Sequence, residues 1–356
     1  MRCQSVGEHK FYLRMITSVD ISKFTAFNKL LLKFSPGINV FIGENGTGKT
    51  HILKMLYSAY SIIGKGEKGD MLAQKVNRVF RPDKDELFRL VHRQQGNLGT
   101  GKFQVTRMGE DGKERHVRLE ITRKSSQTFN LKIWGSDTKN QRSVYIPVKD
   151  MLANAPGFKA LYDERMTSYE EIYADVITKA LLPAVKGKPS PAKQELFSLI
   201  QELIGGTVVE KNEHFFLHNQ QGNLEFSLLA EGFRKLGLIF TLIQNDTLSA
   251  NSVVFWDEPE ANLNPKLAKQ LASIIVKLQQ LGVQIFIATH DYIFLRELEM
   301  AVLENKCTDY RIFSLYHNEE KEVVCEEGKS VEKLNVCAID EAYDSLLLRT
   351  LQNSWE

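Results

Sequence analysis

The chain has 356 residues, 43% hydrophobic and 25% charged, and these ordinary globular values exclude the disordered and low-complexity classes. Lys and Arg number 46 against 44 Asp and Glu, and the net charge of +2 excludes a uniformly basic nucleic-acid coat. Four scattered cysteines without a CxxC pair favour a reducing cytosol. No apolar run approaches the roughly 20 residues that span a bilayer, so we expect a cytoplasmic protein without a membrane partner.

Charge is nevertheless uneven along the chain. Residues 65–124 contain 15 basic and 9 acidic residues, whereas residues 297–356 contain 6 basic and 14 acidic ones. The simpler interpretation is two solvated faces of opposite sign. The alternative is a basic surface for nucleic acid and an acidic segment for a partner.

The first half of the chain mixes strands and helices. Residues 1–14 are expected to form an N-terminal extension, because a better pattern begins at Met15. The alternation over 16–24 predicts a half-buried strand, and the apolar run 38–42 predicts a buried one. A helical pattern starts at Thr50. Alternating stretches within 99–146, with Gly and Asp between them, predict a β-meander.

The second half begins with helices over 150–206, which prolines interrupt, so no long coiled coil is expected. Residues 207–228 are β-rich. The remaining pattern predicts a helix, a strand, a helix, a strand and a helix at 231–245, 253–256, 265–281, 283–288 and 292–304.

A phosphate-binding loop lies between the buried strand and the first helix. Residues 43–50 read GENGTGKT and fit G-x-x-x-x-G-K-[ST], with the required strand before and helix after. Backbone N–H groups and the helix N-terminus favour phosphate there, and Thr50 is a predicted Mg²⁺ ligand. The predicted nucleotide-binding residues are Asn45, Gly46, Thr47, Gly48, Lys49 and Thr50.

Two carboxylates end a very apolar strand in SVVFWDEP, residues 252–259. A buried strand ends in Asp-Glu at low cost only where a cation or water receives the charges. Successive strand residues point to opposite sides, so one carboxylate can face a metal and the other an attacking water. Asp257 is the predicted Mg²⁺ ligand and Glu258 the predicted general base.

His290 ends the next predicted strand, in VQIFIATH. A lone histidine is more often a structural residue. The order of phosphate loop, Asp-Glu and histidine favours a catalytic role at the γ-phosphate.

These motifs resemble those of ABC-type ATPase heads, in the soluble branch with the SMC, RecF and OLD-like ATPases. The resemblance covers about 15–62 and 225–300, and YIPVKD at 145–150 looks like a segment of small bacterial ATPases of this branch. It implies an α/β fold, with a mixed sheet core, an antiparallel β subdomain and a short helical insertion. The implied division is a two-lobed head at 15–149 and 207–310, a helical insertion at 150–206 and an acidic C-terminal segment at 311–356.

The resemblance also places a signature motif at 229–235, LAEGFRK. Ala230 replaces the serine that usually contacts the γ-phosphate of a partner subunit. Gly232 and the helix N-terminus retain backbone groups for phosphate. Arg234 or Lys235 would supply the missing charge. The D-loop falls at 262–264, and Lys149 lies about where a Q-loop glutamine is expected.

The resemblance implies an ATP hydrolase that needs ATP and Mg²⁺ and forms a homodimer or larger oligomer through ATP-sandwiched heads. About 55 residues follow the last ATPase strand, too few for a fused nuclease, so the expected partner is a separate effector nuclease. Similar small ATPases occur in anti-phage defence operons of the PARIS and Septu types. Two alternatives remain: a RecF-like clamp on duplex DNA, and a nucleotide-dependent scaffold with negligible turnover.

Overall fold

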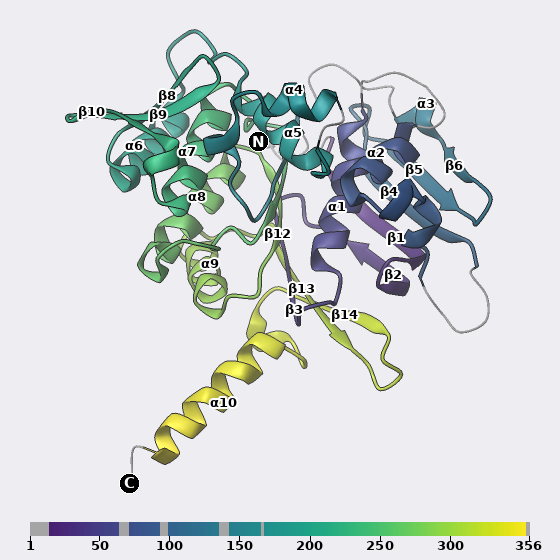
Figure 1. Cartoon of the computed structure of the whole chain (residues 1–356). Helices are drawn as coiled ribbons and strands as arrows, with labels where there is room; N and C mark the ends of the chain where they lie inside the picture. Colours follow the sequence, from purple (N-terminus) through teal and green to yellow (C-terminus); the bar gives the residue numbers. More distant parts are fainter. Residues whose placement is uncertain (1–13, 64–70, 93–98, 135–141, 165–166, 354–356) are drawn as a thin grey trace, which may run out of the picture.

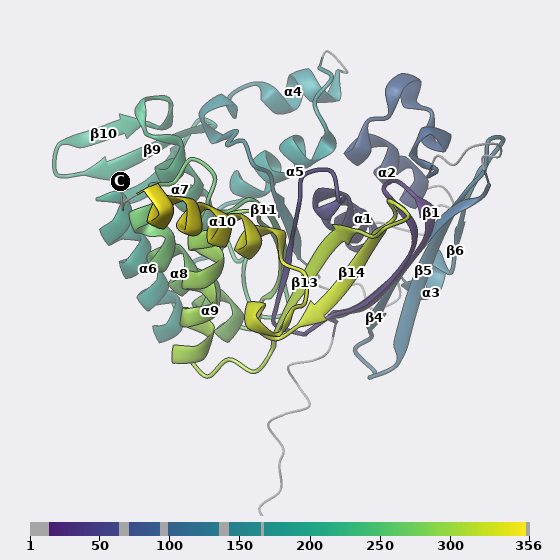
Figure 2. The same ribbon diagram turned by 90° about the horizontal axis from the view of Figure 1, so that it is seen from below.

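The computed structural model describes residues 14–63, 71–92, 99–134, 142–164 and 167–353, and Figure 1 shows their arrangement. A central sheet separates an antiparallel β lobe from a helical lobe in both views (Figure 1, Figure 2). The predicted extension at 1–14 lies almost wholly outside the described residues.

The central sheet has six strands in the order β14-β13-β3-β12-β11-β7. All neighbours are parallel except β13 and β14. Strands such as INVFIG and VVFWD are buried along their whole length and mainly apolar because both faces of the sheet are covered. The bounds are β3 Ile38–Gly43, β7 Ser143–Ile146, β11 Val253–Asp257, β12 Gln284–Ala288, β13 Tyr310–His317 and β14 Val323–Gly328.

The antiparallel lobe is a five-stranded sheet in the order β2-β1-β4-β5-β6. Its strands alternate buried and more exposed residues, as a sheet with one covered face does. The helices α1 and α2 lie between this sheet and the central one and fill the core that the two sheets share. The bounds are β1 Ile16–Phe24, β2 Phe27–Lys33, β4 Gly101–Met108, β5 Glu114–Ile121, β6 Ser126–Phe129, α1 Lys49–Ser61, α2 Met71–Phe80 and α3 Leu131–Trp134.

The helical lobe covers the other face of the central sheet with a second core, to which Val40, Trp256 and Ile287 contribute. A small sheet in the order β10-β9-β8 borders it. The bounds are α4 Phe158–Asp163, α5 Glu171–Ala180, α6 Pro191–Ile204, β8 Thr207–Lys211, β9 His214–Asn219, β10 Gly222–Glu225, α7 Glu231–Gln244, α8 Ala268–Gln280 and α9 Tyr292–Glu304.

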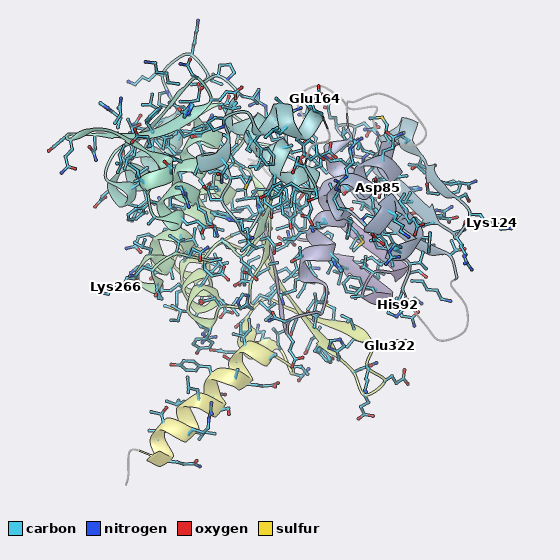
Figure 3. All side chains as sticks on the ribbon, viewed as in Figure 1. Asp85, His92, Lys124, Glu164, Lys266 and Glu322 are labelled. Carbon is cyan, nitrogen blue, oxygen red and sulfur yellow. The ribbon has the colours of Figure 1, made fainter. Side chains whose placement is uncertain are left out.

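Polar contacts join the lobes to the central sheet. The fully buried amide of Gln284 on β12 donates to the carbonyls of Ile16 and Ser35 and accepts from the Ile16 N–H. Figure 3 marks Glu322 on the loop before β14, where it accepts a hydrogen bond from Asn28 of β2 at 2.7 Å. These contacts fix the antiparallel lobe against β12 and against the β14 edge of the central sheet.

Two strands differ from the sequence prediction. Residues 143–146, expected in the antiparallel meander, form β7 and pair in parallel with β11. Residues 310–317 form β13, which pairs in parallel with β3, so the segment set apart at 311–356 supplies two strands of the central sheet. Both pairings join segments far apart in the chain, which local alternation does not reveal. The predicted helix at 265–281 begins as a 3₁₀ turn at Pro265–Leu267.

The helix α10 (Ala338–Asn353) extends away from the body in Figure 1. Its Tyr343 ring stacks on Tyr292 of α9 with centroids 4.0 Å apart. No helix among the described residues is long and apolar enough to cross a membrane.

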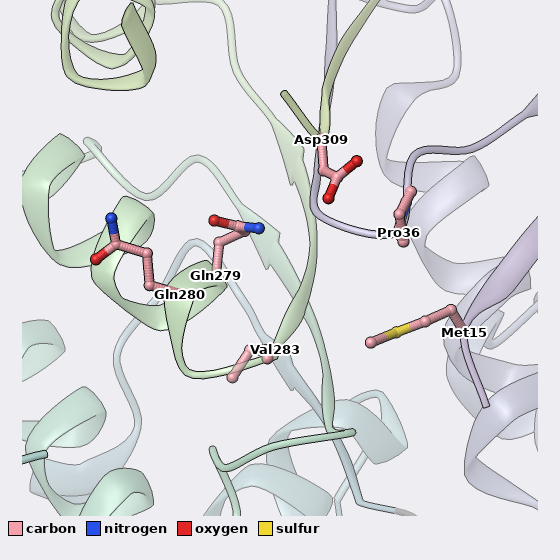
Figure 4. Close-up of a pocket in the computed structure, with 7 residues that line it drawn as sticks. Met15, Pro36, Gln279, Gln280, Val283 and Asp309 are labelled. Carbon is pink, nitrogen blue, oxygen red and sulfur yellow. The ribbon is translucent and has the colours of Figure 1, made fainter. Parts of the chain in front are cut away.

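A cavity of about 260 Å³ lies at the amino ends of the strands, between Met15, Pro36 and Val283 (Figure 4), opposite the edge that carries the predicted site residues.

Candidate nucleotide site

The loop between β3 and α1 has the backbone shape that its glycines predict. Gly46 and Gly48 have φ values of 86° and 90°, which favour glycine over other residues. A Cβ at Gly48 would lie 2.6 Å from the Phe27 ring, whereas Gly46 faces open space. The Lys49 ammonium donates to the carbonyls of Gly43 and Glu44 at 2.7 and 2.9 Å, across the base of the loop. This arrangement, followed by the free N-terminus of α1, fits a phosphate group.

The predicted metal ligands lie next to each other although 207 positions separate them. Thr50 Oγ1 donates to Asp257 Oδ1 at 3.1 Å. Asp257 is 5% exposed, and burial raises its pKa. A hydroxyl and a carboxylate at this corner are the oxygen ligands that suit Mg²⁺ bound together with phosphates.

Asp257 has a second partner that the sequence analysis did not assign. The Tyr145 hydroxyl on β7 donates to Asp257 Oδ2 at 3.0 Å. Burial raises the pKa of Tyr145 well above its ordinary value, so the hydroxyl remains a donor. The sequence signal for it was a tyrosine between the apolar residues Val144 and Ile146, at the start of the YIPVKD segment.

Glu258 and His290 come together at the carboxyl edge of the central sheet. His290 Nδ1 lies 3.0 Å from Glu258 Oε1. The Glu258 side chain is 28% exposed and the His290 side chain 51% exposed, so water reaches both. Glu258 has a φ of 47°, which turns the chain out of β11 immediately after Asp257. Glu258 therefore lies outside β11, so the strand alternation used in the prediction does not set its direction.

A third carboxylate, Glu260, lies behind this pair. Thr289 Oγ1 donates to Glu260 Oε1 at 2.6 Å, and Oε2 is buried without a hydrogen-bond partner. Burial raises the pKa of Glu260 to about 7. Glu260, which no sequence motif singled out, joins the segment after β11 to Thr289 at the end of β12.

The signature segment begins α7, with Ala230 at the N-cap and no side-chain cap. A Cβ at Gly232 would lie 2.6 Å from the Leu263 side chain, so this glycine permits α7 to pack against the D-loop. Arg234 Nε lies 3.3 Å from Asp150 of the same chain. Lys235, predicted as an alternative charge for the nucleotide, is 1% exposed and donates to the Ala261 carbonyl at 2.8 Å.

The sequence-predicted residues therefore form two groups. The phosphate loop, Asp257, Glu258 and His290 lie at the carboxyl edge of the central sheet. Gly232 and Arg234 lie at the start of α7, where Gly232 packs against Leu263 and Arg234 lies 3.3 Å from Asp150. Lys149 is exposed, and Asn264 accepts from the Lys266 N–H as a local helix cap.

Comparisons with known proteins agree with this architecture. Two solved structures resemble it: an SmcHead bound to the C-winged helix domain of ScpA (TM-score 0.57, 14% identity, 90% of this chain and 98% of that one) and an Smc head domain with an extended coiled coil bound to the C-terminal domain of ScpA, derived from Pyrococcus furiosus (TM-score 0.54, 12% identity, 96% and 100%). At these identities the likeness shows the fold alone.

Curated relatives match over shorter stretches. The DNA replication and repair protein RecF of Clostridium botulinum (strain Loch Maree / Type A3) is 42% identical over 53 residues, 15% of this chain and 14% of that protein. RecF of Streptococcus thermophilus (strain ATCC BAA-491 / LMD-9) is 29% identical over 83 residues, 23% and 22%. The chain thus matches less than a quarter of the length of these two relatives.

One family covers most of the chain, since residues 38–296 match the family described as "AAA domain, putative AbiEii toxin, Type IV TA system". That range runs from β3 to α9 and includes the phosphate loop, the Asp-Glu pair and His290. The chain belongs to this AAA-domain family, and its fold is the ABC-type P-loop fold of the SMC head domains.

Proposed function

We propose that this protein binds and hydrolyses ATP with Mg²⁺. The observation that carries the proposal is the 3.1 Å contact between Thr50 of the phosphate loop and Asp257 of β11, with the Glu258–His290 pair beside it. A phosphate loop alone indicates nucleotide binding. A hydroxyl, a carboxylate and an accessible carboxylate–imidazole pair at one edge provide the groups that phosphoryl transfer to water requires.

Each residue in the proposed reaction has a defined task. Loop N–H groups and the Lys49 ammonium hold the β- and γ-phosphates, once Lys49 exchanges the carbonyls of Gly43 and Glu44 for phosphate oxygens. Thr50 and Asp257 would hold Mg²⁺, which supplies charge neutralisation on the phosphates when bound. Glu258 accepts a proton from the attacking water, and His290 orients the Glu258 carboxylate.

We further propose that two heads enclose ATP between them, and that the N-terminus of α7 of each head faces the nucleotide of the other. The fold shared with SMC heads supports this arrangement. Gly232 has no side chain, and the Arg234 guanidinium lies 3.3 Å from Asp150 of its own subunit. Backbone N–H groups of α7 are therefore the groups that would meet the partner's phosphate.

The biological role we propose is control of a separate effector, a nuclease, in a bacterial anti-phage system in the cytoplasm. It rests on the resemblance of the YIPVKD segment and of the motif order to small defence ATPases. The solved SmcHead bound to a domain of ScpA supports a protein partner for this fold. The RecF-like alternative predicts DNA binding. In β5 the basic side chains Arg115 and Arg118 lie 3.3 and 3.1 Å from Asp111 and Glu120, which reduces the free positive charge on that face.

The first experiment measures steady-state ATP hydrolysis by the wild type and by Glu258→Gln, with the mass of both followed with and without Mg²⁺–ATP. We expect wild-type turnover, a 10²- to 10⁴-fold lower rate in the variant, and an ATP-dependent mass gain in the variant. Lys49→Ala removes the phosphate-binding ammonium and is the control. It should lose both ATP hydrolysis and, when added to Glu258→Gln, the ATP-dependent mass gain.

Two results would redirect the proposal. ATP binding and a mass gain without hydrolysis in the wild type would favour the scaffold. Duplex DNA binding that weakens steeply with salt would favour the clamp.

A further inference from the structure

Asp257 is held from two sides. Thr50 of α1 donates to Oδ1 and Tyr145 of β7 donates to Oδ2, at 3.1 and 3.0 Å. Because each oxygen has a donor on a different element, both the position and the plane of the carboxylate are fixed. Mg²⁺ demands nearly ideal octahedral geometry, so the plane of a carboxylate near it matters.

The strand register explains why Tyr145 reaches this carboxylate. Tyr145 lies opposite Phe255 in the parallel pairing of β7 with β11. Asp257 is two residues further along β11 and therefore points to the same face as Phe255, toward α1. A tyrosine side chain is long enough to cover that step of two residues. Phenylalanine at this position would fill the same space without reaching Asp257 with a polar atom.

We propose that Tyr145 is a positioning residue for the magnesium site, whose hydroxyl holds the Asp257 carboxylate in the orientation that binds the metal with nucleotide. This inference rests on the proposed function and adds a residue to it. Groups behind a metal ligand typically change metal affinity 10- to 100-fold when removed. The role belongs to the hydroxyl alone, because the ring has a separate task in the core.

The competing explanation is that Tyr145 only fills the core. Its ring packs edge-on against Tyr57 with centroids 5.6 Å apart, and the side chain is 1% exposed. Tyr57 offers a matched control, because it is also buried and its hydroxyl also donates to a carboxylate, that of Asp175, at 2.5 Å. Asp175 lies on α5 and belongs to an ion pair with Lys75 rather than to the nucleotide site.

The test compares Tyr145→Phe with Tyr57→Phe in the full chain. A fluorescent ATP analogue is titrated in EDTA and in a series of Mg²⁺ concentrations, and Mn²⁺ binding in the presence of ADP is followed by electron paramagnetic resonance. We expect Tyr145→Phe to keep its affinity in EDTA and to need about 10- to 100-fold more Mg²⁺ or Mn²⁺ for half-saturation. Tyr57→Phe should match the wild type in both measurements.

A double-mutant cycle separates positioning from a general loss of structure. In an Asp257→Asn background, adding Tyr145→Phe should cause no further change in the Mn²⁺ concentration for half-saturation, because the carboxylate to be positioned is gone. Equal metal dependence of Tyr145→Phe and the wild type would overturn the inference. The inference would also be overturned if Tyr145→Phe raised the Mn²⁺ concentration for half-saturation equally in the wild-type and Asp257→Asn backgrounds. A wild type that binds nucleotide with no dependence on Mg²⁺ would overturn the proposed metal site itself. If Tyr145→Phe does not fold, a near-wild-type metal dependence in folded Tyr145→Leu would overturn the inference.

Discussion

Arg234 Nε lies 3.3 Å from Oδ2 of Asp150, a carboxylate whose side chain is completely buried. Burial raises the pKa of Asp150, and the guanidinium opposes that rise. The pair joins the start of α7 to the segment that follows β7. The Asp150 N–H also donates to Glu231 at 3.2 Å, so the same junction has a second polar contact.

The first prediction concerns this pair. Arg234→Met should destabilise the fold by about 3 kcal/mol, because it leaves a buried carboxylate without its cation. Arg234→Met with Asp150→Asn should recover most of that loss, since the charge that required a partner is also removed. Urea unfolding followed by circular dichroism measures both. Wild-type stability of Arg234→Met, together with loss of the ATP-dependent mass gain when Arg234→Met is added to Glu258→Gln, would mean that the guanidinium acts on the partner's nucleotide instead.

The second prediction concerns Glu260 and pH. Burial raises its pKa from 4.5 to about 7, so its contribution to stability is complete below about pH 4.5 and is lost as pH rises through 7. Glu260→Gln mimics the protonated form. Between pH 5 and 8 the wild type should therefore lose about 3 kcal/mol relative to Glu260→Gln.

Thermal unfolding at pH 5, 6, 7 and 8 checks the Glu260 prediction. Glu195→Gln is the control, because the Glu195 side chain is 64% exposed and pairs with Lys277 at the surface. Parallel pH curves for the wild type and Glu260→Gln would contradict the prediction.

The third prediction uses two glycines with positive φ. Gly43 ends β3 at φ 137°, and a Cβ there would lie 2.0 Å from the Leu315 carbonyl oxygen of β13. Gly112 lies in a turn at φ 74° with nothing within 4 Å. Gly112→Ala should cost about 1 kcal/mol from backbone strain, and Gly43→Ala well over that, because the two strands must also separate. Similar unfolding midpoints for the two variants would show that the strands separate easily.

The fourth prediction concerns Lys235. Its ammonium donates to the carbonyls of Ala261 and, at 3.4 Å, Glu258. Lys235→Met should slow ATP hydrolysis while leaving ATP affinity in place, because it frees the loop that follows the catalytic carboxylate but does not touch the phosphate loop. Turnover and equilibrium binding are measured together, with Lys269→Met on the exposed side of α8 as control. Loss of affinity equal to the loss of turnover would contradict this role.

The local parts of the site were predictable from sequence. The phosphate loop needs a strand, three glycines and a helix within about 25 residues, and all of them appear in the chain in order. Asp257 and Glu258 were recognisable because charged residues at the end of an apolar strand are costly unless a cation or water receives the charges. The contact between Thr50 and Asp257 followed from the family's motif order.

Long-range pairing was the part that sequence did not reveal. The SVYI segment alternates no differently from a meander strand, so its place beside β11, and hence the contact of Tyr145 with Asp257, depends on a parallel pairing about 110 residues away in sequence. Arg234 carried a charge suited to phosphate, and only the fold shows the buried Asp150 next to it.

The pairing of β13 with β3 has a consequence for biosynthesis. The strand that leads into the phosphate loop is made early, whereas the partner that lies along it, with Leu315 opposite Gly43, is made roughly 270 residues later. At about 5–20 residues per second, both edges of β3 stay unpaired for tens of seconds, because its other partner, β12, is also made late. During that interval the nascent chain carries a phosphate loop whose supporting sheet is incomplete, and the unpaired edges of β3 are exposed to mispairing.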